Sequence, residues 1–450
     1  MLYRKIENAI NSYLKSDTDK VLVVTGARQI GKSYIIRHCA RQLFKNFLEI
    51  NLVEDAQGPR VFDTVRTIDD FYIALAAYGN VPLGDRKDSL IFLDEIQEYP
   101  HLLTLFKFLR EDGRYRFVAS GSMLGVSLKR TTSIPLGSID ILKMYPLDFE
   151  EFLIANGIGS PMIDALKKSY EDVTTVNEGV HNRVMDLYKR YLLVGGLPEA
   201  VNKYIETRDL VRVRDVQQSI IDLYRIDAAK YDKDHSLKIG RIYNLIPSNM
   251  ENKKKRVVYK EIEGEGRKRA SDYDEEMEYL ISSGIAVEVR AISNPKFPLI
   301  ETEQKNLIKL YMNDPGLLTC VLYRNNPMPV LNSENSINLG SVYECAVACQ
   351  LAANGNEMFY YDNRLKGEVD FLVDDYNSLT VMPIEVKSGK DYKRHVAISR
   401  LVTNREYGIN RGYVLSNSNI VEEENDIVYM PVYFSVFIGN QPYKQEAIII

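Results

Sequence analysis

Short apolar runs alternate with amphipathic segments along the first third of the chain. Four runs are rich in β-branched or aromatic side chains, as strands are: residues 21–25, 47–52, 89–95 and 114–120. Apolar side chains recur at helical spacing at residues 1–19, 34–43 and 68–78. Strands that alternate with helices predict a parallel sheet with helices on both faces, and therefore an α/β fold.

The patterns after residue 160 are less regular. Helical spacing recurs at residues 187–193, 217–224 and 237–246, and Gly195-Gly196 indicates a turn. A further helix is expected at 272–283 and a strand at 285–289, an order that suits a winged helix. Beyond an Asn- and Ser-rich linker, the pattern predicts one helix and three strands: residues 340–353, 359–361, 369–373 and 381–386.

Length and composition narrow the classes of protein. A chain of 450 residues with 45% hydrophobic and 26% charged residues is expected to fold into two to four domains. The net charge of −5 excludes binding of polyanions by bulk charge, so any contact with nucleic acid must be local. Four cysteines and five histidines form no metal-binding spacing, and no apolar stretch reaches membrane-spanning length. We expect a reduced, cytoplasmic protein without a membrane partner.

The first strand-like run leads directly into GARQIGKS, which fits G-x-x-x-x-G-K-[S/T] at every fixed position. Glycines let such a loop close around phosphates, whose charge is met by backbone N–H groups and a helix N-terminus. Lys32 is expected to reach the β- and γ-phosphates of ATP, and the Ser33 hydroxyl to ligate Mg²⁺. The predicted nucleotide-binding residues are Gly26, Ala27, Arg28, Gln29, Ile30, Gly31, Lys32 and Ser33.

Two adjacent acids end the strand-like run at residues 89–95. Carboxylates beside an apolar core are costly unless they are used or paired. We expect Asp94 to hold Mg²⁺ and Glu95 to orient or deprotonate the attacking water. Ser122 follows the next strand and is either a hydrogen-bonding sensor of the γ-phosphate or an ordinary turn serine.

A second set of ionisable residues lies in the last third of the chain. Glu385 and Lys387 stand two positions apart, so they project from one face of a strand, and Asp370 precedes them as a hairpin neighbour. With Glu344 on the preceding helix they resemble the PD-(D/E)xK nuclease constellation. That resemblance implies that Glu344, Asp370 and Glu385 hold Mg²⁺, with Asp370, Glu385 and Lys387 in catalysis. The alternative is a purely structural pair of acids, compensated by Lys387 and a neighbouring cation.

Residues 252–269 form the densest basic segment of the chain. Its cations are interleaved with glutamates, so the segment is equally well explained as a phosphate-binding surface or as a solvated loop. The hypothesis of phosphate binding is based on its two basic clusters: Lys253, Lys254, Lys255, Arg256, Arg267, Lys268 and Arg269.

Several segments together resemble the predicted AAA-superfamily ATPases that carry a C-terminal domain of unknown function. They are GARQIGKS, FLDEIQEYP, VASGSMLG, MYPLDFEEFL, YLLVGGLPEAV, VVYKEI, GRKRASDYDEEMEYLISSGI, LYMNDPGLL, GEVDFLV and PIEVKSG. The resemblance implies an ATPase core at residues 1–160, a helical and winged-helix region at 161–325 and a nuclease-like α/β domain at 326–450. Many relatives carry a basic residue where this chain has Ser138. If that residue reaches a phosphate, this protein either uses Lys129 or Arg130 in its place or hydrolyses ATP slowly.

Two functions from different classes remain open at this stage. In the first, an ATPase cycle moves a winged helix and a nuclease-like domain on DNA or RNA. In the second, the protein is a nucleotide-controlled switch or scaffold that binds a protein partner or further copies of itself, with an inert nuclease-like domain. Stimulation of ATP turnover by nucleic acid would separate them.

Overall fold

The computed structural model describes residues 1–78, 83–122, 136–231, 236–252, 255–263, 269–334, 337–363, 367–389 and 392–439. The chain forms two compact units. The N-terminal unit consists of Arg4–Tyr145 and Glu278–Ile285, and the C-terminal unit of Met1–Tyr3, Pro146–Met277 and Ala286–Ile450. No helix among the described residues is both long enough and apolar enough to cross a membrane.

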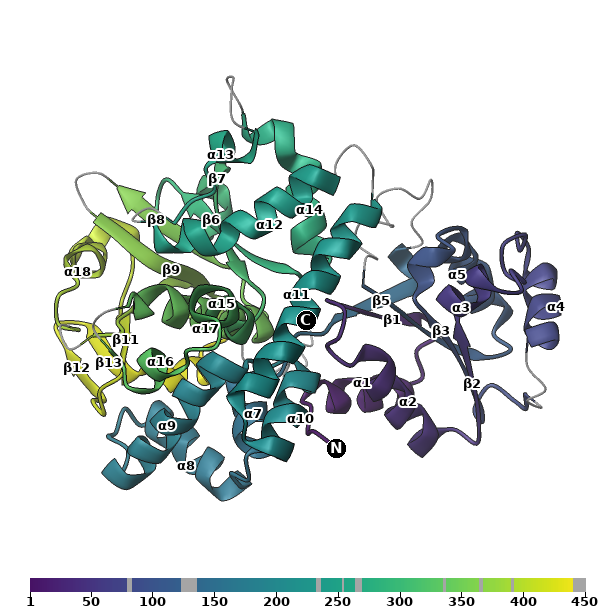
Figure 1. Cartoon of the computed structure of the whole chain (residues 1–450), viewed down its shortest axis with the longest axis horizontal. Coiled ribbons are helices and arrows are strands. Elements are labelled where there is room, and N and C mark those ends of the chain that lie inside the picture. Colours follow the sequence, from purple (N-terminus) through teal and green to yellow (C-terminus); the bar gives the residue numbers. More distant parts are fainter. Residues whose placement is uncertain are drawn as a thin grey trace, which may run out of the picture. The chain divides into compact units, whose positions relative to one another are not determined.

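The N-terminal unit is built on a five-stranded, fully parallel sheet in the order β2-β3-β4-β1-β5 (Figure 1). Its strands are β1 (Val21–Thr25), β2 (Asn46–Asn51), β3 (Ser89–Asp94), β4 (Arg116–Gly121) and β5 (Ile139–Lys143). Its helices are α1 (Ile6–Lys15), α2 (Lys32–Leu43), α3 (Leu52–Gln57), α4 (Ile68–Tyr78) and α5 (His101–Asp112). One face of the sheet packs on Leu52, Phe71 and Phe106, from α3, α4 and α5, in a continuous apolar core.

The C-terminal unit contains a mixed sheet of eight strands in the order β12-β13-β11-β10-β9-β8-β6-β7. These strands are β6 (Ala286–Ile292), β7 (Glu303–Met312), β8 (Phe359–Asn363), β9 (Gly367–Asp375), β10 (Thr380–Val386), β11 (Gly412–Ser416), β12 (Glu422–Glu424) and β13 (Ile427–Pro431). The strand pairs β8–β9 and β9–β10 are antiparallel, whereas β10–β11 and β11–β13 are parallel.

Helices account for most of the remaining C-terminal unit. Those before β6 are α7 (Phe149–Ala155), α8 (Ser160–Glu171), α9 (Glu178–Val194), α10 (Pro198–Thr207), α11 (Leu210–Tyr231), α12 (Ser236–Glu251) and α13 (Tyr259–Glu263). Those after β7 are α15 (Pro315–Tyr323), α16 (Met328–Leu331), α17 (Leu339–Ala353) and α18 (Val396–Thr403). The helix α14 (Asp274–Ser282) begins in the C-terminal unit and ends in the N-terminal one.

The predicted α/β fold with a parallel N-terminal sheet is confirmed. The sequence pattern missed β5, because its IDILK sequence is only five residues long and its polar residues, Asp140 and Lys143, do not alternate with apolar ones. It also missed β7 and the last three strands. The limits predicted at 160/161 and 325/326 stay predictions. The eight-stranded sheet spans the limit at 325/326, because β6, which precedes this limit, pairs in parallel with β8, which follows it.

A buried aspartate joins two segments of the C-terminal unit that lie far apart in sequence. Asp314, at the N-cap of α15, accepts hydrogen bonds from the backbone N–H groups of Gly196 (2.6 Å) and Leu317 (3.0 Å). Burial raises the pKa of its carboxyl to about 6, and those N–H donors oppose the shift. A Cβ at Gly195, whose φ is +72°, would overlap this carboxylate, so only glycine fits there.

The end of helix α9 is closed by two side chains from helix α11. Gln217 donates to the carbonyl oxygens of Leu193 (2.8 Å) and Val194 (2.9 Å), and Arg214 donates to Leu193 (3.2 Å). These carbonyls have no partner within their own helix, so the two buried side chains satisfy them. The Gly195-Gly196 turn is therefore fixed from both sides, by α11 and by Asp314.

Gly196→Ala should destabilise the C-terminal unit by about 3 kcal/mol, as overpacking does. An added Cβ would overlap the carbonyl group of Leu147, whose N–H donates to the Gly196 carbonyl (2.7 Å). Thermal unfolding followed by circular dichroism measures the loss. Gly240→Ala is the matched control, because nothing lies within 4 Å of its added Cβ in α12. Equal melting of Gly196→Ala and the parent would contradict the packing described.

Candidate functional site

The loop between β1 and α2 adopts a conformation that requires its glycines. Gly26 has φ +138° and Gly31 has φ +92°, and Gln29 is also left-handed at +64°. A Cβ at Gly26 would overlap the carbonyl oxygen of Met144, whose N–H donates to Thr25 (2.8 Å). The GARQIGKS segment thus forms a tight turn between a buried strand and a helix that begins at Lys32.

Lys32 turns its ammonium group back onto this loop. Its Nζ donates to the carbonyl oxygens of Ala27 (2.8 Å) and Gly26 (3.0 Å), and the side chain is buried. Burial lowers the pKa of Lys32 to about 8, although the carboxylates of Glu95 and Asp94 oppose the shift. An ammonium ion held only by neutral carbonyls is ready to exchange them for a phosphate.

Asp94 lies at the end of β3 and is surrounded by hydroxyl groups. Ser120 on β4 donates a hydrogen bond to its Oδ1, and the Ser33 hydroxyl also bonds to this carboxylate. Burial raises the pKa of Asp94, and both serines oppose the shift. The predicted pair Ser33 and Asp94 is therefore brought together at the carboxyl end of the parallel sheet. Ser120 was missed, because the sequence pattern assigned it only to a strand.

Glu95 is held in an unusual backbone conformation beside Asp94. Its φ and ψ are +58° and +49°, which a residue with a Cβ rarely adopts. Gln97 donates from Nε2 to Glu95 Oε2, and a Cβ at Gly121 would lie 2.6 Å from Gln97 Oε1. Gln97 is thus a positioning residue for Glu95 that sequence reasoning missed, and Gly121 of the SGS segment provides the space for it.

Ser122 is buried beside the loop. Arg28 Nε donates to its Oγ at 3.4 Å, so this hydroxyl contacts a residue of the P-loop rather than only its own turn. Ser138 is also buried, in the 3₁₀ turn Leu136–Ser138. Lys129 and Arg130, the expected substitutes for a basic residue there, lie outside the described residues.

One further contact reaches the loop within the N-terminal unit. Gly284 has φ +75°, and a Cβ there would lie 3.0 Å from the backbone nitrogen of Ala27. The turn after α14 therefore lies directly against the P-loop. Gly284 belongs to the GRKRASDYDEEMEYLISSGI segment, and its role was not predicted.

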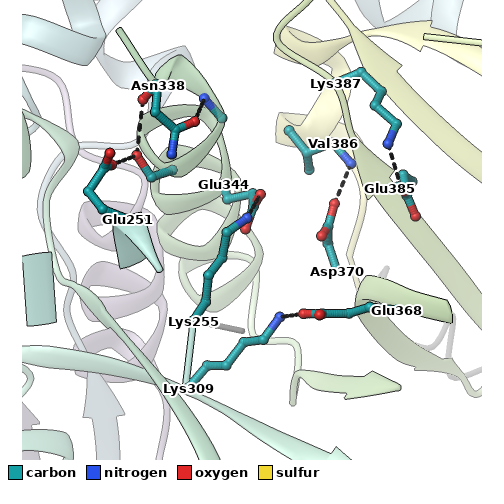
Figure 2. Close-up of polar contacts among 12 residues, drawn as sticks. Glu251, Lys255, Lys309, Asn338, Glu344, Glu368, Asp370, Glu385, Val386 and Lys387 are labelled. Atoms are coloured by element: carbon teal, nitrogen blue, oxygen red, sulfur yellow. Dashed lines mark hydrogen bonds and ion pairs between the residues drawn. The ribbon is translucent and has the colours of Figure 1, made fainter. Parts of the chain in front are cut away.

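The acidic site of the C-terminal unit gathers the predicted acids from three elements. Glu344 lies on α17, Asp370 on β9 and Glu385 on β10, the antiparallel neighbour of β9 (Figure 2). Asp370 accepts a hydrogen bond from the N–H of Val386 (2.9 Å), and Lys387 Nζ donates to Glu385 Oε1 (2.6 Å). The predicted hairpin and the shared face of Glu385 and Lys387 are both present. Glu385 Oε2 is buried and has no hydrogen-bond partner among the described residues.

Two lysines from outside the predicted quartet also reach this site. Lys255 forms an ion pair with Glu344 Oε1, and Lys309 Nζ lies 2.5 Å from Glu368 Oε1, as Figure 2 shows. Tyr311 donates from its hydroxyl to Glu344 Oε2 (3.4 Å). The side chain of Lys309 has 0% exposure and also lies 4.5 Å above the ring centre of Tyr360.

These contacts change the interpretation of the basic segment. Lys255 is paired with Glu344, and Arg256 forms an ion pair with Asp362, so neither cation is a free phosphate ligand. Lys253, Lys254, Arg267 and Lys268 lie outside the described residues. Arg269 is exposed, and its N–H donates to Asp272 (2.9 Å).

Burial and mutual repulsion dominate the electrostatics of the acidic site. Burial and the charge of Asp370 raise the pKa of Glu344 to about 7, and Lys255 opposes the shift. The same two causes raise the pKa of Glu385 to about 7, opposed by Lys387. Burial works against the charge of Lys255, but Glu344 and Asp370 raise its pKa above the ordinary value. Within the described residues, no three His, Cys, Asp or Glu side chains are grouped closely enough to hold a metal ion.

The low pKa of Lys32 predicts how nucleotide affinity depends on pH. Only the protonated ammonium attracts phosphates, so affinity should be constant below about pH 8 and fall about tenfold per unit above it. Calorimetric titration of the full chain with a nucleoside triphosphate, from about pH 7.5 to about 9.5, tests this. Lys32→Arg is the control, because guanidinium stays charged throughout and its profile should be flat. A flat profile for the parent protein would show that Lys32 does not bind the phosphates.

Comparison with known proteins supports part of this picture. Residues 18–153 match the family model of an AAA domain. Residues 185–327 and 339–434 match two domains of unknown function, DUF8612 and DUF4143. A search of the curated proteins finds no significant match.

Solved structures with a related arrangement are distant in sequence. A Walker-type ATPase of Pyrococcus abyssi is 15% identical with a TM-score of 0.41, over 74% of this chain and 96% of that one. Hsp104 of S. cerevisiae in its ADP complex is 12% identical with a TM-score of 0.29, over 63% and 38%. PCH-2 of C. elegans is 9% identical with a TM-score of 0.28, over 46% and 65%. These scores are too low to carry an argument.

The assignment therefore rests on the family match, the parallel sheet and the P-loop geometry. Lys32, Ser33 and Asp94 converge at the carboxyl end of the sheet, where an open α/β sheet binds its ligand. Residues 18–153 are a nucleotide-binding domain of the AAA type.

Proposed function

We propose that this chain is a Mg²⁺-dependent ATPase whose cycle acts on nucleic acid, and that its acidic site cleaves phosphodiester bonds with a divalent cation. The observation that carries the ATPase assignment is the convergence of Lys32, the Ser33–Asp94 pair and Glu95 at one end of the parallel sheet. The four cysteines form no disulfide, which supports the cytoplasmic location expected from the sequence.

The P-loop residues fit a magnesium nucleotide. A hydroxyl and a carboxylate, Ser33 and Asp94, already share a hydrogen bond, and this donor set suits Mg²⁺. The bound ion would supply charge neutralisation at the β- and γ-phosphate oxygens. Lys32 would leave the Gly26 and Ala27 carbonyls for those phosphates, and Glu95, held by Gln97, would accept the proton of the attacking water.

The acidic site fits a divalent cation through its buried donors. Glu385 Oε2 meets no hydrogen-bond donor in the part of the chain that the structure describes, and Asp370 carries the second carboxylate on the adjacent strand. Two carboxylates completed by water ligands are a normal set for Mg²⁺ or Mn²⁺. The three acids of the described site are not grouped closely enough for a three-carboxylate site, so Glu344 would become a third ligand only if Lys255 left it and it moved toward the other two. The cation would supply a Lewis acid for the phosphate, and Lys387 would steady the charge as water adds to phosphorus and the ester P–O bond breaks.

A second candidate function is favoured by the ion pairs of the same site. Lys255 on Glu344 and Lys387 on Glu385 compensate two acids without a metal, as a structural cluster would. The protein would then be a nucleotide-controlled switch or scaffold for a partner protein or for further copies of itself. Fold-level likeness to a nuclease does not carry activity with it.

Glu95→Gln should leave ATP binding nearly unchanged and lower ATP turnover at least about a hundredfold, because it retains the shape and loses the base. Turnover of the parent should rise on addition of single- or double-stranded DNA or RNA. Phosphate release and calorimetric binding measure the two quantities. If no nucleic acid changes ATP turnover and Glu95→Gln is inactive, the nucleotide-controlled switch is favoured. Full ATPase activity of Glu95→Gln would refute the role of Glu95.

Asp370→Asn should abolish phosphodiester cleavage in Mg²⁺ or Mn²⁺ while ATP turnover is retained. The amide keeps the side chain's volume, but it lacks the charge that holds the cation. Fluorescent DNA and RNA substrates, linear and structured, measure cleavage. Asp375→Asn is a matched control on the same strand, because Asp375 is the last residue of β9 and its carboxylate accepts a hydrogen bond from Ser378. Equal cleavage by Asp370→Asn and the parent would refute the assignment.

A further inference from the structure

One lysine of the acidic site comes from a segment that is neither helix nor strand. Lys255 lies between α12 and α13, in a strap that we define as residues 255–258. Its ammonium group is paired with Glu344, and the side chains of the two are 18% and 4% exposed. In Figure 2, Lys255 reaches toward α17 from the side opposite to Asp370 and Glu385.

The strap is fixed to the sheet at two points. The N–H of Val257 donates to the carbonyl oxygen of Ile308 on β7 (3.1 Å), and Arg256 is paired with Asp362 on β8. The Arg256 guanidinium also lies 5.5 Å from the ring centre of Tyr360. Lys255 itself has φ +49°, a conformation that residues with a Cβ rarely adopt and that surrounding contacts must hold.

The charges of the site depend on Lys255. Four carboxylates face the cluster, and three lysines balance them: Glu344, Glu368, Asp370 and Glu385 against Lys255, Lys309 and Lys387. Without Lys255, two lysines would face four carboxylates in a largely buried site. Glu344 would then either take up a proton or pair with another cation, and among cations carboxylate oxygens favour a divalent one.

We propose that Lys255 is an internal counter-cation that competes with a divalent cation for the Glu344 carboxylate, so that a seated strap closes the acidic site to metal. This inference rests on the metal-dependent site of the proposed function. When Lys255 is bound, its charge neutralises Glu344 and its ammonium group occupies one of the two carboxylate oxygens. Asp370 and Glu385 then remain as the carboxylates available to a metal ion.

The other two lysines do not offer the same exchange. Lys309 belongs to β7, has no exposed side-chain surface and pairs with Glu368 rather than with a predicted ligand. Lys387 is two positions from Glu385 and moves with it. A displacement of the strap, which breaks the contacts of Arg256 and Val257, removes the Lys255 cation while the sheet keeps its strand pairing.

The test is a calorimetric titration of Mn²⁺ into the full chain without nucleotide. Four proteins are compared: the parent, Lys255→Met, Lys255→Arg and the double variant Lys255→Met with Asp370→Asn. Lys255→Met should bind Mn²⁺ at least about tenfold more tightly than the parent, because the competing charge is gone. Lys255→Arg retains the charge and should match the parent, and the double variant should lose the tight site.

Thermal unfolding supplies a second readout that does not depend on catalysis. Lys255→Met should melt earlier than the parent in a chelator, since Glu344 is left without its cation, and Mn²⁺ should restore the midpoint. The parent should change little. If Lys255→Met folds only with Mn²⁺, the inference is supported; if it stays unfolded with Mn²⁺, the exchange is refuted.

The outcomes separate this inference from the function on which it rests. Equal Mn²⁺ affinity in Lys255→Met and the parent, with binding lost in the double variant, would overturn the counter-cation and leave the metal site standing. No binding by any of the four proteins would overturn the metal site itself. Binding that persists unchanged in the double variant would place the ion elsewhere and refute both.

Discussion

An ionised side chain that leaves water must find an opposite charge or well-placed hydrogen-bond partners, and this requirement organises each functional region of the protein. Lys32 is met by two loop carbonyls, Asp314 by backbone N–H groups and Glu344 by Lys255. In each case the partner comes from a different part of the chain or from a turn that only glycine permits. The same contacts that satisfy buried charge therefore also fix the geometry.

The three regions differ in how replaceable those partners are. The partners of Asp314 are backbone groups of Gly196 and Leu317, which cannot leave unless the turn and α15 separate. The partners of Lys32 are neutral carbonyls, which a phosphate outcompetes because it carries charge. A neutral partner that is easily exchanged suits a ligand site, and a backbone partner suits a permanent joint. The motif segments YLLVGGLPEAV and LYMNDPGLL thus serve the fold, since they meet at Asp314.

Sequence reasoning succeeded where local pattern decides structure. The P-loop with its strand and helix, the helix Ile68–Tyr78 and the hairpin that places Asp370 beside Glu385 all follow from periodicity and turn residues. It failed where a contact depends on an unusual backbone turn or on a partner far along the chain. Gln97 reaches Glu95 across a left-handed turn, and Lys255 meets Glu344 over 89 positions, so no local pattern shows either contact. For the same reason, the sequence pattern at 253–256 did not show that Lys255 and Arg256 are paired with distant acids.

The acidic site shows why ion pairing alone does not distinguish a metal-dependent catalytic site from an inert structural cluster. Two acids close together in a buried site repel, so both readings require compensating cations, and the observed pairs satisfy either one. What distinguishes them physically is whether a compensating cation can leave at low cost. Lys309 is embedded in a strand and cannot, whereas Lys255 lies on a strap whose contacts to the sheet are the Arg256–Asp362 ion pair, the Arg256–Tyr360 contact and the Val257 backbone hydrogen bond. A permanent structural cluster gains nothing from placing its cation on such a segment. A site that must admit a divalent ion at one stage of its cycle and exclude it at another needs an arrangement of this kind.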